Sequence, residues 1–259
     1  MPFPNFPNKH REEAFITPEA AVAHFVTDDP PLPFPEAVIF CYQSSLLTHI
    51  LDRHETAGIE RGTYRHLHWL QETENRVAVA GGFGVGAPAV VLVLEALIVQ
   101  GVRRFLTIGT AGSLQRHVGI GDIVVCDRAV RDEGTSHHYL PPEKYAHASP
   151  AMTSRLVAAL QTADIAHSVG TSWTTDAPYR ETTAEVQHYQ AEGVLTVEME
   201  AAALFAVAAY RGVEMGSLLT ISDSLADLTW DPQFRSDTTR EGLETLYQVA
   251  LQALQAASD

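Results

Sequence analysis

The sequence is poor in cysteine and in positive charge. Its 259 residues include two cysteines, Cys41 and Cys126, each in an apolar run and without a CxxC pair. We therefore expect buried thiols in a reducing compartment rather than a disulfide or a metal site. Seventeen lysines and arginines stand against 32 aspartates and glutamates, a formal net charge of −15. This charge argues against nucleic-acid or anionic-membrane binding and favours a soluble protein.

Long apolar stretches and cofactor fingerprints are missing as well. No run approaches the length of a membrane span, and the N-terminal segment MPFPNFPNKHREE has prolines where a signal peptide needs an apolar block, so we expect a cytoplasmic protein. The glycines of residues 81–88 lack GxGxxG spacing, which argues against a dinucleotide site. His137 and His138 have no further ligand at metal spacing, so we expect no metal.

The remaining sequence alternates apolar strand-like runs with segments of helical period. Residues 1–35 form a proline-rich arm, interrupted by a short helix that begins at Thr17 and Pro18. Residues 36–259 form a single domain, and the 46% hydrophobic content of the chain is enough for a substantial core. The alternation predicts an α/β fold with a mainly parallel central sheet covered by helices.

Three carboxylates fall at the ends of two predicted strands. An apolar run ends in Glu198 and Glu200 before an Ala-rich helix, and the strand at 216–221 leads to Asp223. Open α/β sheets bind ligands at such strand ends, so one crevice could receive all three. A glutamate in the first turn of a helix and an aspartate as N-cap are also favoured without any chemistry, and this alternative stays open.

Small and aromatic residues follow other strands. The glycines of residues 81–88 indicate either a tight turn or a backbone that passes close to a ligand. Residues 109–113 follow the strand at 104–108, and their free N–H groups would suit an anion. Trp173 lies on a strand-end loop, where it either closes the core or stacks on a flat base.

Together these motifs resemble the nucleoside phosphorylases of the purine nucleoside and uridine phosphorylase type. The resemblance covers about residues 77–224 and rests on GVGAP at 84–88, IGTAG at 108–112, VGIGDIVV at 118–125, VEMEAAA at 197–203 and ISD at 221–223. It implies a three-layer αβα fold and phosphate-dependent cleavage of a ribonucleoside to free base and ribose 1-phosphate. It also implies no metal or redox cofactor, phosphate as co-substrate, and a homo-oligomer built as a dimer or a trimer of dimers.

The resemblance also implies roles for individual residues. Glu200 matches the carboxylate that holds the ribose hydroxyls, with Met199 under the sugar and Glu198 in the same subsite. Asp223 matches the acid that protonates the purine ring as the base departs, which requires a raised pKa. The other implied contacts are to phosphate, from Gly84, Gly109 and Thr110, and to the base, from Ala111, Gly112 and Trp173.

The chain departs from the family where cations are expected. Residues 40–46 contain neither the Gly-Asp-Pro turn nor the arginine of the phosphorylases, and Thr107 replaces a second arginine. Charge-assisted contacts are the strong part of a phosphate site. The arginines that could replace these two missing phosphate ligands are Arg61, Arg131, Arg180 and Arg235.

These departures leave alternatives open. Water could replace phosphate and give a nucleoside N-ribohydrolase, although residues 41–49 lack the glutamate base of the hydrolase relatives. A non-catalytic nucleoside-binding protein is a further alternative. Asp223 favours purines, whereas residues 129–138 look nearer to the uridine branch, so a uridine phosphorylase stays an alternative.

Overall fold

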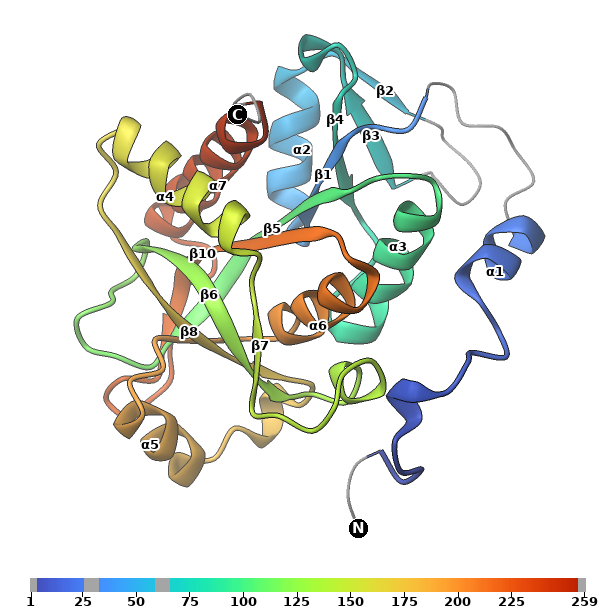
Figure 1. Ribbon diagram of the computed structural model, residues 1–259. Coiled ribbons are helices and arrows are strands. Elements are labelled where there is room, and N and C mark those ends of the chain that lie inside the picture. Colours follow the sequence, from blue (N-terminus) through green and yellow to red (C-terminus); the bar gives the residue numbers. More distant parts are fainter. Residues whose placement is uncertain (1–3, 26–32, 59–65, 256–259) are drawn as a thin grey trace.

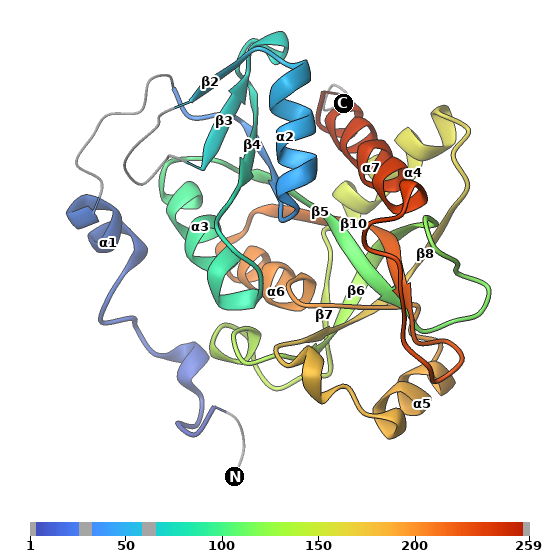
Figure 2. The ribbon, with the colours of Figure 1, turned by 180° about the vertical axis from the view of Figure 1, so that it is seen from behind.

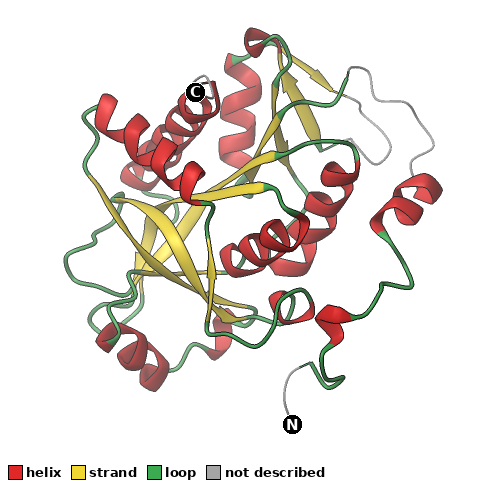
Figure 3. Ribbon diagram, in the orientation of Figure 1, coloured by secondary structure: helices red, strands yellow, loops and turns green. Residues whose placement is uncertain are grey.

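The computed structural model describes residues 4–25, 33–58 and 66–255, which form an α/β fold (Figures 1 and 3). The strands are β1 (Ala37–Cys41), β2 (Thr56–Gly58), β3 (Leu67–Leu70), β4 (Val77–Gly81), β5 (Arg104–Ser113), β6 (Ile123–Asp132), β7 (Tyr145–His147), β8 (His167–Thr175), β9 (Thr196–Glu198), β10 (Glu214–Ser224) and β11 (Asp231–Pro232). The α-helices are α1 (Pro18–Phe25), α2 (Ser44–Arg53), α3 (Ala87–Val99), α4 (Pro150–Thr162), α5 (Thr183–Ala191), α6 (Ala201–Arg211) and α7 (Asp237–Gln255). Short 3-10 turns are η1 (Lys9–Arg11), η2 (Gln71–Thr73), η3 (Ser136–His138) and η4 (Pro178–Arg180).

The strands belong to one mixed sheet that is open at one end and closed at the other. β1 pairs in parallel with β4 and β5, and β3 and β2 continue the sheet outward. Beyond β5 the pairings run from β5 to β10, β6, β8 and β9 and return to β5, which closes a circuit of five strands. The predicted α/β fold with a mixed central sheet is confirmed, and the closed circuit is an addition to it.

Helices cover the sheet on two sides, which confirms the three-layer arrangement. α3 and α6 pack in one hydrophobic core, and α2, α4 and α7 pack in a second core on the other side (Figures 1 and 2). Strand β1 supplies both cores in alternation, with Phe40 in the first and Ile39 and Cys41 in the second, because successive side chains of a strand point to opposite faces. Cys41 and Cys126 are buried free thiols, as expected. None of the helices in the described ranges combines the length and apolar character of a membrane span.

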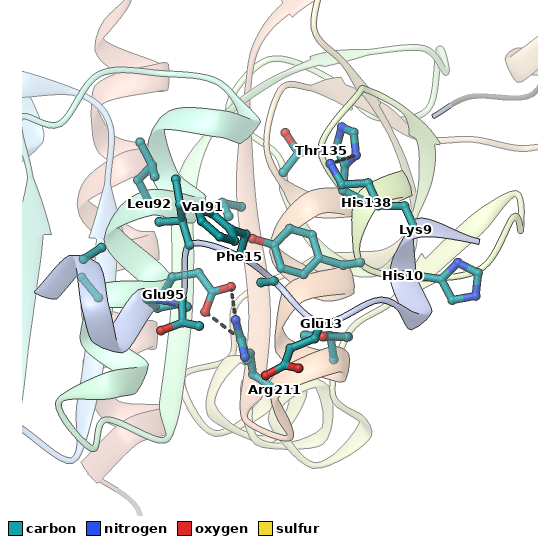
Figure 4. Close-up of a pocket in the computed structure, with 18 of the residues that line it drawn as sticks. Lys9, His10, Glu13, Phe15, Val91, Leu92, Glu95, Thr135, His138 and Arg211 are labelled. Carbon is teal, nitrogen blue, oxygen red and sulfur yellow. Dashed lines mark hydrogen bonds and ion pairs between the residues drawn. The ribbon is translucent and has the colours of Figure 1, made fainter. Parts of the chain in front are cut away.

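The N-terminal arm lies along the outside of the molecule (Figure 1). Its short helix begins as predicted, since the N–H of Ala20 donates to Oγ1 of Thr17 over 3.2 Å. A hollow of about 650 Å³ lies between the arm and helices α3 and α6. The ion pair between Arg211 and Glu95 borders this hollow, with Phe15 of the arm nearby (Figure 4). This hollow is separate from the strand ends that carry the predicted site.

Candidate active site

Asp223 owes its position to a bulge in β10. The ladder between β10 and β5 pairs Ile221 with Ala111 and Asp223 with Gly112, so Ser222 is an extra residue without a partner. Bulges redirect the side chains that follow, because strand side chains alternate between the two faces. Asp223 is largely buried, 8% exposed, and Oγ of Ser222 donates to its Oδ1 over 2.8 Å.

Gly112 separates the two strand ends that carry the carboxylates. It pairs with Asp223 of β10 on one side and with Val197 of β9, which precedes Glu198, on the other. Asp223 and Val197 therefore lie on the two sides of one residue of β5. A Cβ on Gly112 would lie 3.1 Å from Oδ2 of Asp223 and 3.0 Å from Cγ1 of Val197. Only glycine leaves Asp223 and Val197 in place. The strand ends that lead to Asp223 and to Glu198 therefore lie on the two sides of Gly112.

Glu198 caps helix α6. One carboxylate oxygen accepts hydrogen bonds from the N–H groups of Glu200 and Ala201, over 2.8 and 2.7 Å. The other oxygen accepts from the hydroxyl of Thr174 and, over 3.4 Å, from that of Ser172. Both oxygens are therefore occupied within the protein, and the carboxylate complements the positive end of the helix. Glu198 was predicted to contact the ribose, but its bonds make it the support that holds Glu200.

Glu200 lies at the start of α6 and is held from the opposite side by a glycine loop. The N–H of Gly86 donates to Oε1 of Glu200 over 2.5 Å. Gly86 has a φ of 94°, which residues with a Cβ avoid, and this conformation directs its N–H towards the carboxylate. Burial, and then the charge of Glu198, raise the pKa of Glu200 to about 8. Met199 is half-buried between the two glutamates, and the predicted phosphate residue Gly84 is exposed in the same loop as Gly86.

The strand next to this loop is longer than expected. β5 continues through Ser113, and Gly109 and Thr110 pair with Leu219 and Thr220 of β10. The prediction that residues 109–113 lie beyond the strand end is therefore wrong. The reason is that β10 provides a parallel partner along this whole segment, so the ladder continues. The N–H groups of successive residues in a parallel strand point to opposite sides, and on the side away from β10 the pairing with β1 ends at Ile108 and the pairing with β9 begins at Gly112, so free N–H groups at residues 109–111 stay a prediction.

Two residues that sequence analysis did not select, Tyr42 and Gln43, lie against this strand. Oη of Tyr42 is 2.7 Å from Oγ1 of Thr107, and Nε2 of Gln43 donates to Oγ1 of Thr110 over 3.1 Å. A Cβ on Gly109 would lie 3.1 Å from the ring of Tyr42. Burial, then the charge of Glu200, raise the pKa of Tyr42 well above its ordinary value, so this phenol stays neutral. The signal in the sequence was the departure of residues 40–46 from the family pattern.

Trp173 lies in strand β8 rather than on a loop, and its ring is enclosed. It is 1% exposed in a third hydrophobic core, with its centroid 4.7 Å from that of Tyr189. Its Nε1 donates to Oδ2 of Asp132 over 2.9 Å. A ring enclosed in this way cannot offer a face to a base, so the structure favours the core alternative for Trp173. The predicted base contacts Ala111 and Gly112 lie on β5, with Ala111 buried and Gly112 beside Asp223.

Two other residues, Trp230 and Glu181, lie at the Asp223 end of the site. Nε1 of Trp230 donates to Oδ2 of Asp223 over 2.9 Å, and the indole is 62% exposed. Glu181 precedes α5 and is half-buried. Burial, then the charge of Asp223, raise the pKa of Glu181 to about 7. No spacing in the sequence connects either residue with Asp223.

The proposed replacement arginines have different environments. Arg131 is buried and donates to Oγ of Ser136 and to the carbonyl of Pro141, over 2.9 and 2.7 Å, so it fastens its own loop. Arg180 and Arg235 are exposed, and Arg61 lies outside the described residues.

The adjacent histidines bind protein groups. Nε2 of His137 is 3.0 Å from the carbonyl of Arg131, and Nδ1 of His138 is 3.0 Å from Nζ of Lys9. Across residues 4–25, 33–58 and 66–255, His, Cys, Asp and Glu nowhere gather in a group of three or more that could hold a metal ion.

Comparison with known proteins connects this fold and site to one family. Residues 39–255 match the model of the Phosphorylase superfamily, and the chain belongs to that superfamily. Uridine phosphorylase from Salmonella typhimurium is 32% identical over 162 residues, which cover 57% of this chain and 64% of the relative. Guanosine phosphorylase from Halorubrum lacusprofundi is 35% identical over 142 residues, which cover 55% of this chain and 59% of the relative. The chain thus spans somewhat less than two thirds of the length of these curated relatives.

Structural comparison agrees on the fold. The crystal structure of uridine phosphorylase from Vibrio fischeri ES114 aligns with a TM-score of 0.69 at 24% identity, covering 86% of this chain and 91% of that one. The resemblance to the nucleoside phosphorylase family, drawn from the sequence motifs, is confirmed.

Proposed function

We propose that this protein is a nucleoside phosphorylase that cleaves the N-glycosidic bond of a ribonucleoside with phosphate, giving free base and ribose 1-phosphate. The observation that carries the proposal is that Gly112 pairs with Asp223 on one side and on the other with Val197, from which the chain leads to Glu200 at the start of α6. Cleavage leaves positive character on the ribose and negative charge on the departing base. A carboxylate at the sugar and a carboxyl group at the base stabilise this separation. The uridine and guanosine phosphorylases among the relatives support the same reaction class.

For the base, we propose a purine. Asp223 supports this choice, because a carboxyl group can bond to a purine ring nitrogen as the base leaves. Uridine is the second candidate, since a uridine phosphorylase is 32% identical to this chain. Comparing kcat/KM for inosine, adenosine and uridine tests the choice, and a clear preference for uridine would contradict it.

For the nucleophile, a specific observation favours hydrolysis as a second candidate. Neutral groups occupy this end of the site, namely the pairs Tyr42–Thr107 and Gln43–Thr110. The nearby acidic groups that act on Tyr42 are the carboxyl groups of Glu200 and Glu198, and their negative charge opposes a phosphate dianion. Arg61, Arg180, Arg235 or a partner subunit would have to supply the positive charge for phosphorolysis.

Incubation of each nucleoside with and without phosphate separates these reactions. Phosphorolysis predicts turnover that requires phosphate and yields ribose 1-phosphate. Turnover unchanged when phosphate is omitted would contradict phosphorolysis and support the N-ribohydrolase. Nucleoside binding measured by calorimetry, without base release under either condition, would indicate a non-catalytic binding protein.

We also propose a homo-oligomer, a dimer or a trimer of dimers. The arm exposes Phe15 and Ile16, which are 101% and 76% exposed, and Leu92 of α3 is 75% exposed. Large apolar side chains gathered at one side are typical of surfaces that associate. Sedimentation at micromolar concentration should give a mass that is a multiple of 28.3 kDa, and a monomer would contradict this proposal.

A further inference from the structure

The side chain of Trp230 makes a direct hydrogen bond to the carboxyl group of Asp223. Its Nε1 donates to Oδ2 over 2.9 Å, and Oγ of Ser222 donates to Oδ1 over 2.8 Å. An indole N–H can only donate, and a carboxyl group keeps acceptor capacity whether or not it is protonated. The contact from Trp230 therefore suits both protonation states of Asp223, and the two contacts together fix the plane of its carboxyl group.

The oxygen that Trp230 holds, Oδ2, lies on the Gly112 side of this carboxyl group. A Cβ on Gly112 would be 3.1 Å from Oδ2 of Asp223. Gly112 pairs on its other side with Val197, from which the chain leads to Glu200. Because an ionised carboxyl oxygen has two lone pairs and the indole N–H uses one, Oδ2 can still accept a second hydrogen bond from a ligand.

Packing does not explain the position of Trp230. Its indole is 62% exposed, and it makes a ring contact with Phe234, which is itself 53% exposed, at a centroid distance of 6.3 Å. Tryptophans that stabilise a core are buried, as Trp69 and Trp173 are at 0% and 1% exposed. The part of Trp230 that the fold places with a defined partner is its N–H group.

The loop that carries Trp230 is fastened by other bonds as well. Strand β11 pairs with the end of β10, and the N–H of Gln233 donates to the carbonyl of Ser222 over 2.8 Å. Nearer to β10, Nε2 of Gln190 donates to the carbonyl of Ala226 over 3.1 Å. Loss of the indole N–H should therefore leave the loop in place and release only one side of the carboxyl group.

We propose that Trp230 is a positioning residue, whose indole N–H holds the Asp223 carboxyl group in the orientation in which it meets the departing base. The inference rests on the proposed function, in which Asp223 acts at the base. Orientation of a reacting group contributes mainly to the chemical step, because its benefit is largest in the transition state. Stacking of the base on the indole, the other use of an exposed ring, would contribute to binding instead.

Two substitutions of Trp230 separate its donor from its ring. Histidine has a five-membered ring whose Nε2 corresponds to the indole Nε1, so Trp230→His keeps a donor on a small ring. Trp230→Phe keeps a larger ring without a donor. In steady-state kinetics with the preferred nucleoside, Trp230→Phe should lower kcat by roughly 10- to 100-fold, with KM within about threefold of wild type. Trp230→His should recover most of the lost kcat.

Phe234→Leu is the matched control, because it changes an exposed aromatic side chain of the same segment that has no donor. Its kcat and KM should stay within about threefold of wild type. Thermal denaturation should give similar midpoints for both Trp230 variants, since the pairing of β10 with β11 and the bond from Gln190 remain.

A Trp230→Phe protein at least as active as Trp230→His would overturn the inference and assign the effect to the ring. A loss in Trp230→Phe that appears only as a higher KM would do the same, and so would a kcat within about threefold of wild type. If wild-type protein cleaves no nucleoside, the proposed function itself fails, and that result is distinguishable from active wild type with an unaffected variant.

Discussion

The backbone N–H of Gly86 donates a hydrogen bond of 2.5 Å to Oε1 of Glu200 and so joins the loop after β4 to the first turn of α6. The side chain of Glu198 holds the same turn, because it accepts hydrogen bonds from the N–H groups of Glu200 and Ala201. Glu200 is therefore positioned by two different segments, and the bond from Gly86 uses one of its carboxylate oxygens. Such positioning from several sides is what a binding carboxylate needs.

Glu200→Ala should strongly reduce nucleoside cleavage. If the Glu200 carboxyl group binds two ribose hydroxyls, its loss removes two hydrogen bonds worth about 0.5–1.5 kcal/mol each, so kcat/KM should fall by roughly 5- to 150-fold. The measurement is steady-state kinetics with the preferred nucleoside. Glu241→Ala, an exposed glutamate on α7, is the control and should behave like wild type. Activity of Glu200→Ala within threefold of wild type would contradict the assignment.

The free energy of unfolding should decrease as pH rises from 5 to 8. The folded protein binds a proton on Glu200 up to a pKa of about 8, against 4.5 for an ordinary glutamate, so protonation favours the folded state in this interval. The slope from one such group approaches roughly 1.4 kcal/mol per pH unit. Urea denaturation at several pH values measures it. Glu200→Gln should reduce the slope, and an equal slope in this variant would assign the effect to other groups.

Gly112→Ala should impair both folding stability and activity. Its Cβ would lie 2.9 Å from Cδ1 of Leu225 and 3.1 Å from Oδ2 of Asp223, so β9 and β10 would have to move apart. Overpacking of this kind costs about 1–3 kcal/mol of unfolding free energy. Gly119→Ala is the matched control, because its Cβ would meet only Oδ2 of Asp122, at 3.8 Å. Equal denaturation midpoints for the two variants would contradict the prediction.

Tryptophan fluorescence should report the base end of the site. Trp230 is 62% exposed, whereas Trp69 and Trp173 are 0% and 1% exposed, so acrylamide should quench mainly Trp230. A nucleoside bound at Asp223 would approach the indole and reduce this quenching. Trp230→Phe removes the donor to Asp223 together with the quenchable emission, so it should show no such response. Unchanged quenching of wild-type protein by a bound nucleoside would place the base elsewhere.

The sequence contained enough information for the layers of the fold and for the main carboxylates. Buried strands such as Ala37–Cys41 read as continuous apolar runs, and the Ala-rich segment after Glu200 reads as a helix, because local composition determines these features. The positions of Glu198, Glu200 and Asp223 at strand ends followed from the same alternation. The different roles of Glu198 and Glu200 could not be predicted from this alternation, because the hydrogen bonds by which Glu198 caps α6 form only when the helix is in place.

Features that depend on distant segments could not be predicted. β5 extends through Ser113 because β10, about a hundred residues later, pairs with it, and local sequence gives no sign of that partner. The sequence predicted Trp173 on a loop, where it could contact a base, but in the structure residues of β6 and α5 enclose it in the third core. Trp230 reaches Asp223 through the turn between β10 and β11, and Glu181 comes from a different loop altogether.

Ser222, the unpaired residue of the bulge in β10, determines to which side of the strand Asp223 points. The position of the Asp223 carboxylate therefore depends on how many residues the strand contains as well as on which residues they are. Removing Ser222 would restore a regular ladder and turn the aspartate to the opposite side of the strand, although every functional residue would still be encoded. Such a deletion would keep the aspartate in the sequence, remove the serine of the ISD motif and turn the Asp223 carboxylate away from the strand-end site. Among distant members of this superfamily, gaps at this point of an alignment therefore carry as much information about activity as substitutions do.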